Sequence, residues 1–597
     1  MVRTLARSHA RGTGAGSHVV TSGTDTPLAG AQRNAPLART SHAPPGIPRG
    51  TLIGAGVLAL LAVVLPPRFT AALLAGNAEA VHVARVYAGV WVFKALLLCH
   101  GIGWIVLARW TRTPPRIRPL IAQPQTPPSA RPLVLFVLLG IAAVLRLVNL
   151  DAGLWYDEIT TLVEQVRAPL GDILSRFATQ NQHPVYSLLA RGTFALFGES
   201  ETTLRLPAAL LGVGSLAALY AFAVRVTTRG EALLATALLT VSYHHVWFSQ
   251  NARGYTGLML FALAGTALLA DLLRQNEWPG WRPYVVYAAV MALGVYTHLT
   301  AAFVIIAHAA IVFVLLARAR RQNGQWTNLP LVVALVLAGT LSLLLYAFML
   351  PQMPDTLFFR ESPILSAAWK SPFWLFAEAA RGLQAGVPGG WPVIIAAMAV
   401  AGAGFVSYAR QNMALATAMV LPPLLMAAVL IASNHNLWPR FFFFAAGFAV
   451  LIAVRGVFAL AAPFGNRANA VAAVVLLAGA AANAAILPRA WAPKQDYRGA
   501  LEYLLDHRQP GDAVAMAGMT RIVYDWYIPA PFTPVTTAAE LEALEQRHER
   551  TWVVYTVPTY LAADVPEVAA RIEALYTEVT RFPGTLGEGA IRIAVRE

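Results

Sequence analysis

The chain has 597 residues, of which 57% are hydrophobic and 13% charged, and its mean hydropathy is +0.55. A soluble protein carries about 25% charged residues, so this composition excludes an ordinary soluble enzyme. The net charge of +15 comes mostly from arginines in short segments between apolar runs, which favours membrane lipids over nucleic acid as a partner. Cys99 is the only cysteine, which excludes a disulfide framework and a thiolate metal cage.

Residues 1–50 are rich in Ser, Thr, Gly, Ala and Pro and show no apolar period, which predicts a disordered, basic cytoplasmic tail. From Thr51 onward, apolar runs of roughly 17 to 25 residues recur, the length that crosses a bilayer as a helix. We therefore expect an all-α polytopic membrane protein with about thirteen transmembrane helices. The expected spans are 51–67, 84–108, 132–150, 203–224, 231–249, 254–273, 284–297, 299–317, 329–351, 391–408, 412–432, 438–462 and 468–488.

The apolar stretch 284–317 is divided at Thr297-His298. A single helix of that length would measure roughly 51 Å and overshoot a hydrocarbon core of about 30 Å. With residues 1–50 inside, the positive-inside rule is satisfied, because the short outer loops are poor in Arg and Lys by comparison. The inner loops then receive Arg109, Arg112, Arg116, Arg118, Arg131, Arg225, Arg229, Arg274, Arg282, Arg318, Arg320, Arg321, Arg410 and Arg467.

This topology leaves three larger pieces on the outer face: the loops 151–202 and 352–390 and the tail 489–597. The amphipathic stretch Pro184–Phe197 and the second loop, rich in Pro, Trp and Phe, are expected at the membrane interface. The tail alternates helical and strand patterns without a GxGxxG or Walker loop, which predicts a small soluble α/β domain and gives no support for nucleotide binding. Its expected helices are Tyr497–Arg508, Ala538–Arg550 and 565–576, and its expected strands are Asp512–Met516, Trp552–Val557 and Ile591–Val595.

Two adjacent carboxylates, Asp157 and Glu158, follow a helix end in the first outer loop, behind the aromatics Trp155 and Tyr156. One interpretation is structural: Asp157 or the preceding turn caps a helix through Ile159–Val166. The other is functional, because a carboxylate at the membrane surface can take a proton from a reacting group. The local sequence leaves both interpretations open.

Other polar side chains occupy short turns predicted on the same face. In the turn 249–255, an aromatic belt with a snorkelling arginine explains most residues but not the combination of Gln, Asn and Arg. Arg440 is a phosphate-binding candidate, because its planar fork of donors stays charged, although snorkelling explains it equally. The candidates for binding are His183, Tyr186, Gln250, Arg253, Tyr255, His298 and Arg440, and the ionisable residues in or near spans are Lys94, Arg205, His308 and Arg455.

A set of short motifs follows in a fixed order along the chain: Arg146-Leu-Val-Asn-Leu, Trp155-Tyr156-Asp157-Glu158, His183-Pro184, Glu201-Thr-Thr-Leu-Arg205-Leu-Pro207, Ser249–Tyr255, Pro439-Arg440-Phe441 and Lys494-Gln495-Asp496-Tyr497-Arg498. In this order, the motifs resemble the GT-C glycosyltransferases of the protein O-mannosyltransferase and aminoarabinose-transferase superfamily, including the bacterial family 39 glycosyltransferases. The resemblance covers roughly 130–530, so 51–130 reads as two additional helices with a cytoplasmic loop, and 131–488 as the catalytic membrane domain.

The resemblance implies an inverting transferase that moves a sugar from a polyprenyl-phosphate donor to a glycan, lipid or protein acceptor. It places the protein in a bacterial cytoplasmic (inner) membrane, with the active site on the periplasmic side. It maps the acidic catalytic residue of the family onto Asp157, with Glu158 orienting the acceptor or the loop. The glutamate that contributes to a metal site in aminoarabinose transferases is absent from Gln182-His183-Pro184. A divalent metal therefore stays open, and no other cofactor is implied.

Two alternatives belong to other classes of protein. A transporter or flippase of a lipid-linked glycan would be built from repeats with ionisable groups near the bilayer midplane. The sequence instead shows no internal repeat, and its polar groups lie at one predicted face. A non-catalytic membrane scaffold, whose tail recruits a partner, is the third reading.

Overall fold

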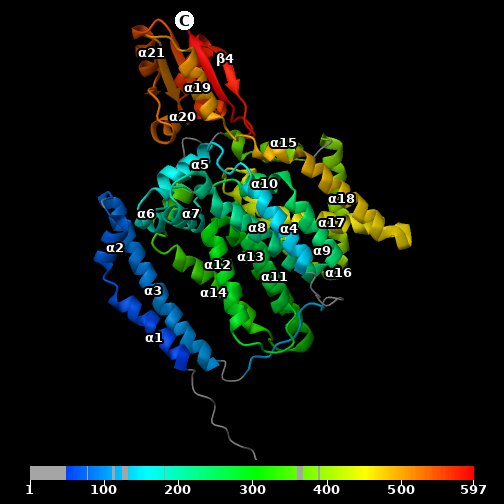
Figure 1. Cartoon of the computed structure of the whole chain (residues 1–597). Helices are drawn as coiled ribbons and strands as arrows, with labels where there is room; N and C mark the ends of the chain where they lie inside the picture. Colours follow the sequence, from blue (N-terminus) through cyan, green and yellow to red (C-terminus); the bar gives the residue numbers. More distant parts are fainter. Residues whose placement is uncertain are drawn as a thin grey trace, which may run out of the picture. The chain divides into compact units, whose positions relative to one another are not determined.

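The structure is a computed structural model that describes residues 49–76, 78–110, 114–123, 132–179, 182–359, 367–386 and 390–597. The expected tail 1–50 therefore lies almost entirely outside the described residues, as do parts of the loops 151–202 and 352–390. Within the described ranges the chain is mainly helical, with a single sheet formed by its C-terminal part (Figure 1).

The helices of the apolar part lie on the predicted spans, but some ends differ by up to eight residues, as at the start of 438–462, where a 3-10 turn at Pro439–Ala445 precedes the helix. Among the described residues, six helical stretches are long and apolar enough to cross a membrane, or up to seven if one bent pair forms a single span. The chain is thus a multi-pass membrane protein, while the number of about thirteen spans stays a prediction. The helices are α1 (Arg49–Val64), α2 (Pro67–Ala75), α3 (Ala80–Trp110), α4 (Pro132–Leu147), α8 (Glu201–Val226), α9 (Arg229–Thr240), α10 (Tyr243–Ser249), α11 (Tyr255–Leu273), α12 (Arg282–Thr297), α13 (Ala302–Asn323), α14 (Leu329–Leu345), α16 (Gly390–Ala432), α17 (Ala446–Ala461) and α18 (Ala468–Ile486).

Three predicted spans are interrupted or joined in ways that local residues explain. The span 231–249 divides into α9 and α10, because Ser242 leaves the helical conformation and its side chain caps α10 by accepting the His245 N–H. The spans 391–408 and 412–432 run together as α16, with a break at Asn412 (φ −157°, ψ 94°). The division at His298 is present: α12 ends at Thr297, and a 3-10 turn precedes α13. The short helix α2 was not predicted; it is bent by 80° from α1.

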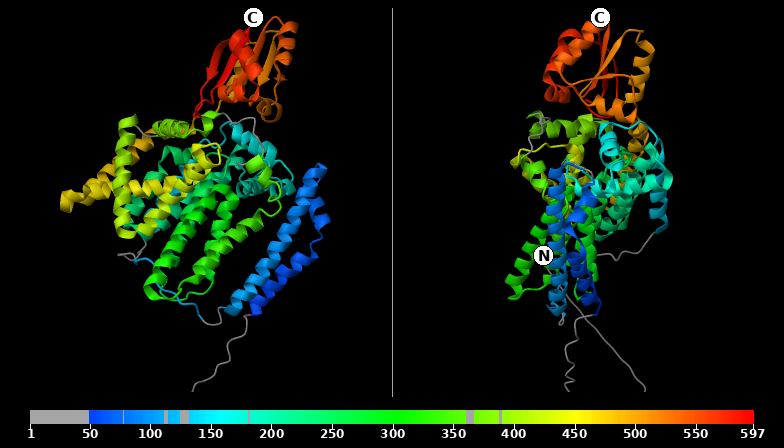
Figure 2. Two further views of the ribbon diagram at one scale, coloured as in Figure 1. Left: turned by 180° about the vertical axis from the view of Figure 1, so that it is seen from behind. Right: turned by 90° about the vertical axis from the view of Figure 1, so that its left-hand side faces the viewer.

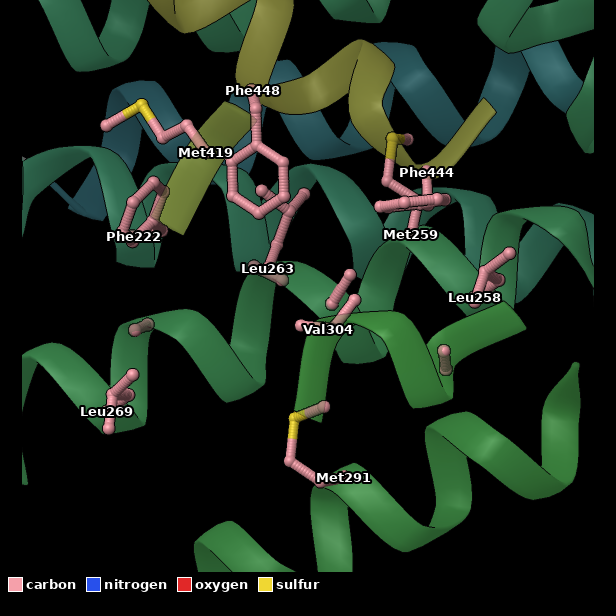
Figure 3. Close-up of a cluster of buried hydrophobic side chains, with 14 of the residues drawn as sticks. Phe222, Leu258, Met259, Leu263, Leu269, Met291, Val304, Met419, Phe444 and Phe448 are labelled. Atoms are coloured by element: carbon pink, nitrogen blue, oxygen red, sulfur yellow. The ribbon is translucent and has the colours of Figure 1, made fainter. Parts of the chain in front are cut away.

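The main apolar core lies between α8, α11, α12, α13, α16 and α17 (Figure 3). Phe222 of α8 packs edge to face against Phe448 of α17, with ring centroids 5.5 Å apart. Gly447 and Gly265 allow close approach: a Cβ at Gly447 would lie 2.9 Å from Leu263, and one at Gly265 would lie 2.1 Å from the Met291 sulfur. This packing holds the helix ends, and the polar turns between them, in fixed positions.

The two ends of this helical bundle differ in composition. One end gathers arginines and their partners: Arg225 pairs with Asp271, Arg118 bonds Asn323, and Arg274 donates to the Ala122 carbonyl. The other end carries the start of α8, the turn before α11 and the α12–α13 break, and all of the candidate site residues lie near it. The expected outer loops therefore meet at the end opposite to the arginine-rich loops.

Four shorter helices and several tight turns make up the outer segments. The stretch Pro184–Phe197, predicted as an amphipathic helix, is α7 with the same limits. The first loop also holds α5 (Tyr156–Thr161), which continues as a π-helical turn over Leu162–Val166, and α6 (Leu170–Ser175). The described part of 352–390 holds a π turn at Asp355–Phe359, a 3-10 turn at Ala367–Lys370 and α15 (Pro372–Gly386). Further 3-10 turns on this side lie at Pro439–Ala445 and Leu487–Trp491, whereas the turn Ala462–Arg467 belongs to the expected inner loop of Arg467.

The C-terminal part is a mixed five-stranded sheet in the order β2-β1-β3-β5-β4 (Figure 2). Strands β2, β1 and β3 are parallel, and β5 pairs antiparallel with β3 and β4. The sequence missed β2, which has only three residues, and β4, whose alternating polar pattern is typical of a half-exposed edge strand. The elements are α19 (Tyr497–His507), β1 (Ala513–Ala517), α20 (Thr520–Ile522), a π turn at Val523–Tyr527, β2 (Thr533–Val535), α21 (Ala538–Arg547), β3 (Thr551–Thr556), α22 (Pro558–Asp564), α23 (Pro566–Leu575), β4 (Thr577–Phe582) and β5 (Ile591–Arg596).

The sheet and the first outer loop share a buried cluster. Leu154, Ile159 and Tyr186 from the loop pack in one cluster with Tyr497 and Trp552 from the C-terminal part. The Leu154 N–H also donates to the Tyr527 hydroxyl at 3.1 Å, and Arg498 pairs with Glu201 at 2.8 Å. The segment that carries the two carboxylates is therefore packed from behind by the C-terminal part.

Candidate functional site

The carboxylate segment begins α5, but Asp157 is not its cap. The N-cap residue is Trp155, and its N–H donates to Glu158 Oε2 at 3.3 Å, as in a capping box. Asp157 lies within the first turn, where its side chain faces two arginines from other elements. The preceding turn therefore provides the N-cap, as one form of the structural interpretation expected, and Asp157 does not, because its neighbour Glu158 supplies the capping carboxylate.

Glu158 is fully buried and is held by an arginine of α8. Arg205 donates to its two oxygens at 2.8 and 2.5 Å, and the Ala252 N–H donates to Oε1 at 2.7 Å. Burial by itself would raise the pKa of Glu158, but the charges of Arg205 and Lys494 and these hydrogen bonds lower it. Since the carboxylate is occupied and has no exposed surface, this geometry favours the loop-orienting role over contact with an acceptor.

Asp157 lies between two guanidinium groups from distant parts of the chain. Its Oδ2 is 3.1 Å from Arg440 and 3.8 Å from Arg253. The Asp157 side chain is 13% exposed and that of Arg440 is 22% exposed, so both reach the surface of the protein. Two guanidinium groups therefore face one carboxylate at a point that reaches the surface.

Each arginine is fixed by neighbours of a different kind. Arg253 follows the turn after α10 and donates to Thr161 Oγ1 at 2.7 Å and to the Asp157 carbonyl at 3.3 Å. Arg440 begins the 3-10 turn Pro439–Ala445, and its guanidinium lies 4.6 Å from the ring centroid of Trp438. The positions of both guanidinium groups are therefore set before any ligand binds.

Behind the arginines lies a group of buried rings. The His183 ring lies 4.9 Å from that of Tyr255 and 4.8 Å from that of His298, which in turn lies 5.3 Å from Phe441. Burial and the nearby charge of Arg253 hold the pKa of His183 well below its usual value, which favours the neutral imidazole. Gly254 favours the close approach of His183, because a Cβ there would make a tight contact of 3.0 Å with Nδ1. These rings support the arginines from inside the protein.

Two of the expected binding residues are engaged elsewhere. The Tyr186 hydroxyl donates to the Leu204 carbonyl at 2.5 Å, which joins α7 to α8. The Gln250 amide donates to the Val148 carbonyl at 2.5 Å, at the end of α4. Both side chains are buried. The structure thus brings together Asp157, His183, Arg253, Tyr255, His298 and Arg440, and it leaves Tyr186 and Gln250 in packing positions.

Several residues around the site were not assigned to it from the sequence. Arg205 was noticeable as an ionisable residue in a span, but its partner Glu158 lies 47 positions away. The Trp438 ring lies against the guanidinium group of Arg440 and packs against the Trp369 ring, with the two ring centroids 4.9 Å apart. Lys494 and Gln495 belong to a recognisable motif whose contacts lie in the first loop and the α10–α11 turn. Pairing over such distances leaves no local pattern in the sequence.

No three side chains of His, Cys, Asp or Glu converge as a metal site within the described ranges. The rings of the two histidines near Asp157, His183 and His298, lie tilted against each other, with centroids 4.8 Å apart and an angle of 39° between their planes.

Comparison with known proteins gives one family match. Residues 181–341 match the family model of the dolichyl-phosphate-mannose-protein mannosyltransferases. This match confirms the resemblance to the GT-C glycosyltransferases over a segment that includes His183, Arg253, Tyr255 and His298. A search of curated proteins finds no match.

Several solved structures are similar in fold at low identity. ArnT of Cupriavidus metallidurans bound to undecaprenyl phosphate is 13% identical, with a TM-score of 0.46, over 78% of this chain and 98% of that one. The oligosaccharyltransferase of Archaeoglobus fulgidus, solved with Zn and sulfate, is 13% identical, with a TM-score of 0.47, over 76% and 72%. The arabinosyltransferase EmbB of Mycobacterium smegmatis is 15% identical, with a TM-score of 0.39, over 62% and 34%.

Proposed function

We propose that the chain is an integral-membrane glycosyltransferase of the GT-C type. In this proposal it moves a sugar, with inversion, from a polyprenyl-phosphate donor to an acceptor on the outer face of the cytoplasmic membrane. The observation that carries the proposal is the placement of Asp157 between Arg253 and Arg440, at the bundle end opposite to the arginine-rich loops. The family match over 181–341 supports the same class of reaction.

The charge of the site suits a phosphodiester. Arg253 and Arg440 bring two positive charges to the single carboxylate of Asp157, so the immediate surroundings of that carboxylate are cationic. A sugar linked to a lipid through one phosphate carries a single negative charge, which such surroundings attract. Arginine presents paired donors to phosphate oxygens, and hydrogen bonds to charged groups contribute about 1.5–3 kcal/mol each.

The reaction then needs a single base. The acceptor hydroxyl gives its proton to the Asp157 carboxylate as its oxygen forms a bond to the anomeric carbon. The bond from that carbon to the phosphate oxygen breaks on the opposite face, and the lipid phosphate leaves with the electron pair. The two arginines stabilise its charge as it departs. Phosphate is already a good leaving group, so no second carboxylate is required, unlike in glycoside hydrolysis.

The remaining site residues have supporting roles in this proposal. Glu158 positions the loop through Arg205 and the Ala252 N–H. His183, Tyr255 and His298 form the buried wall behind the arginines. None of these rings is a carboxylate, so they bring no negative charge to compete with the donor phosphate for the arginines.

The orientation also belongs to the proposal. The positive-inside rule places the arginine-rich end in the cytoplasm. Asp157 and the C-terminal part then face the periplasm of a bacterial cell, where lipid-linked sugars would be consumed. Glycan, lipid and protein hydroxyls remain the three classes of acceptor.

Turnover of the purified protein tests the function. In detergent, a transferase supplied with a polyprenyl-phosphate sugar and envelope extract should release polyprenyl phosphate and glycosylate an acceptor, which mass spectrometry would identify. A flippase would show no chemistry in detergent and would need two compartments. Movement of the intact lipid-linked sugar across vesicles, without transfer in detergent, would contradict the proposal in favour of the flippase.

A further inference from the structure

We propose that Lys494 and Gln495, at the start of the C-terminal part, are positioning residues that hold the backbone around Asp157 in place. This inference rests on the proposed function, in which Asp157 is the base. The two residues contact the backbone of Tyr156, which precedes Asp157, and of Gln250, three residues before Arg253. Neither of them contacts the reacting groups directly.

Gln495 connects the sheet to the start of α5. Its Oε1 accepts the Tyr156 N–H at 2.9 Å, and its amide nitrogen donates to Thr556 Oγ1 and to the Gly589 carbonyl, both at 3.2 Å. The first N–H groups of a helix have no partner within the helix. Gln495, which is 2% exposed, therefore fixes the backbone of the residue directly before Asp157.

Lys494 holds the turn that leads to Arg253. Its Nζ donates to the Gln250 carbonyl at 2.6 Å and lies 5.2 Å from the ring centroid of Trp247. Three residues after Gln250 comes Arg253, and between them the Ala252 N–H donates to Glu158. Lys494 thus contacts the turn that contains Arg253. The same turn also donates a hydrogen bond to the buried carboxylate of Glu158.

The chain closes over these two residues. The Trp247 indole N–H donates to Thr585 Oγ1 at 2.8 Å, so the β4–β5 connection also reaches α10. A Cβ at Gly584 would lie 2.0 Å from the Lys494 carbonyl oxygen, so only glycine allows this connection to approach. Two separate segments of the C-terminal part, residues 494–495 and the β4–β5 connection, therefore form an interface with α10 and its neighbouring loops.

The buried charge of Lys494 has a specific partner. Burial lowers the pKa of Lys494 to about 7, while the charge of Glu158 opposes this shift and that of Arg205 adds to it. Glu158 of α5 and Arg205 of α8 are the charged groups that face the lysine, and Trp247 of α10 presents its ring. Deprotonation removes one of the two cations beside Glu158, so the site should be organised better below pH 7 than above it.

Misplacement of a reacting group by about 1 Å can cost a factor of about 10² in rate. A positioning role therefore predicts a loss in kcat with little change in donor KM, because Arg253 and Arg440 remain. A purely structural role predicts fewer folded molecules with unchanged kinetics for each one.

The chain offers a matched control for the lysine. Lys94 also donates to a backbone carbonyl, that of Leu65, at 2.7 Å, and lies 5.0 Å from the Trp91 ring, but it belongs to the α1–α3 region. We expect Lys494→Met to lower kcat about 10- to 100-fold and Lys94→Met to leave it unchanged. In the wild type and in Lys94→Met, kcat should decline as the pH rises through about 7, and Lys494→Met should lack this decline.

Gln495→Met tests the role proposed for the glutamine, and Gln546→Met, at an exposed glutamine, serves as its control. Hydrogen exchange of the Tyr156 amide should quicken in Gln495→Met and not in Gln546→Met, and kcat should fall only in the former. This exchange readout does not depend on activity. Absence of transfer in the wild type would end the proposed function, while the exchange result would still decide whether Gln495 holds the loop.

Three results would overturn the inference. One is wild-type kcat, per folded molecule, in both Lys494→Met and Gln495→Met. Another is an equal loss in the matched controls. The third is unchanged exchange at Tyr156 in Gln495→Met, which applies even if Lys494→Met fails to fold.

Discussion

Helix α8 carries an arginine near each end, and the two arginines have opposite surroundings. Arg225 pairs with Asp271 at 2.7 Å, and their side chains are 31% and 40% exposed. Arg205 pairs with Glu158 at 2.5 Å, and theirs are 2% and 0% exposed. An exposed pair can relax into water, whereas a buried one must be complete. The buried pair, whose geometry is fixed, therefore lies at the Arg205 end of α8, and Asp157 lies at the same end.

The two ends should differ most sharply in access to reagents. In a Cys99→Ala background, a cysteine at Glu540 should react with a membrane-impermeant thiol reagent in intact cells with a permeabilised outer membrane. One at Arg320 should be protected, because the positive-inside rule places the arginine-rich loops in the cytoplasm. Protection of the Glu540 cysteine with labelling of the Arg320 cysteine would reverse the orientation and move the site to the wrong side for the proposed reaction.

Breaking the two ion pairs should have unequal effects on stability. Arg205→Met leaves the Glu158 carboxylate buried without its cation, and such a change costs about 3–5 kcal/mol. Arg225→Met removes a partly exposed pair, worth about 0–1 kcal/mol. Thermal unfolding of the purified variants in the same detergent measures both changes. Similar losses would mean that the buried pair is no more critical than the solvated one.

The two arginines that we propose to bind the donor phosphate should show a smaller effect, and one confined to the donor. Arg253→Lys and Arg440→Lys keep the charge and lose the fork of donors. We expect kcat/KM for the donor to fall about 10- to 100-fold, which corresponds to about 1.5–3 kcal/mol, with normal unfolding. The exposed Arg498→Lys, away from Asp157, serves as control. Wild-type kinetics in both site variants would reduce these arginines to anchors of helix ends.

The fold was predictable from the sequence to the extent that it depends on apolar length. The division at His298 followed from the thickness of a bilayer, and α7 was predicted with its observed limits. The interruption at Ser242 was missed, because a single capping serine inside an apolar run has too little effect on hydropathy. The edge strand β4 was missed because its half-exposed residues leave only a polar alternation.

The candidate site was predictable only where residues sit in unusual local surroundings. Asp157, Arg253 and Arg440 were noticeable as charges in short turns of an apolar chain. Only the family resemblance gave Glu158 a role different from that of Asp157, because the burial of Glu158 depends on Arg205, a partner fixed by tertiary packing. For the same reason, Tyr186 and Gln250 were expected at the site, although their polar atoms are used by backbone carbonyls nearby.

The Asp157→Asn variant tests the central claim most directly. Asparagine keeps the size of the side chain and removes the base, and base catalysis contributes about 10²–10⁴-fold. With a polyprenyl-phosphate sugar as donor, we predict that the variant unfolds at the wild-type temperature and transfers at least about a hundredfold more slowly. Normal unfolding together with near-normal transfer would contradict the account, because Asp157 would then not be the base.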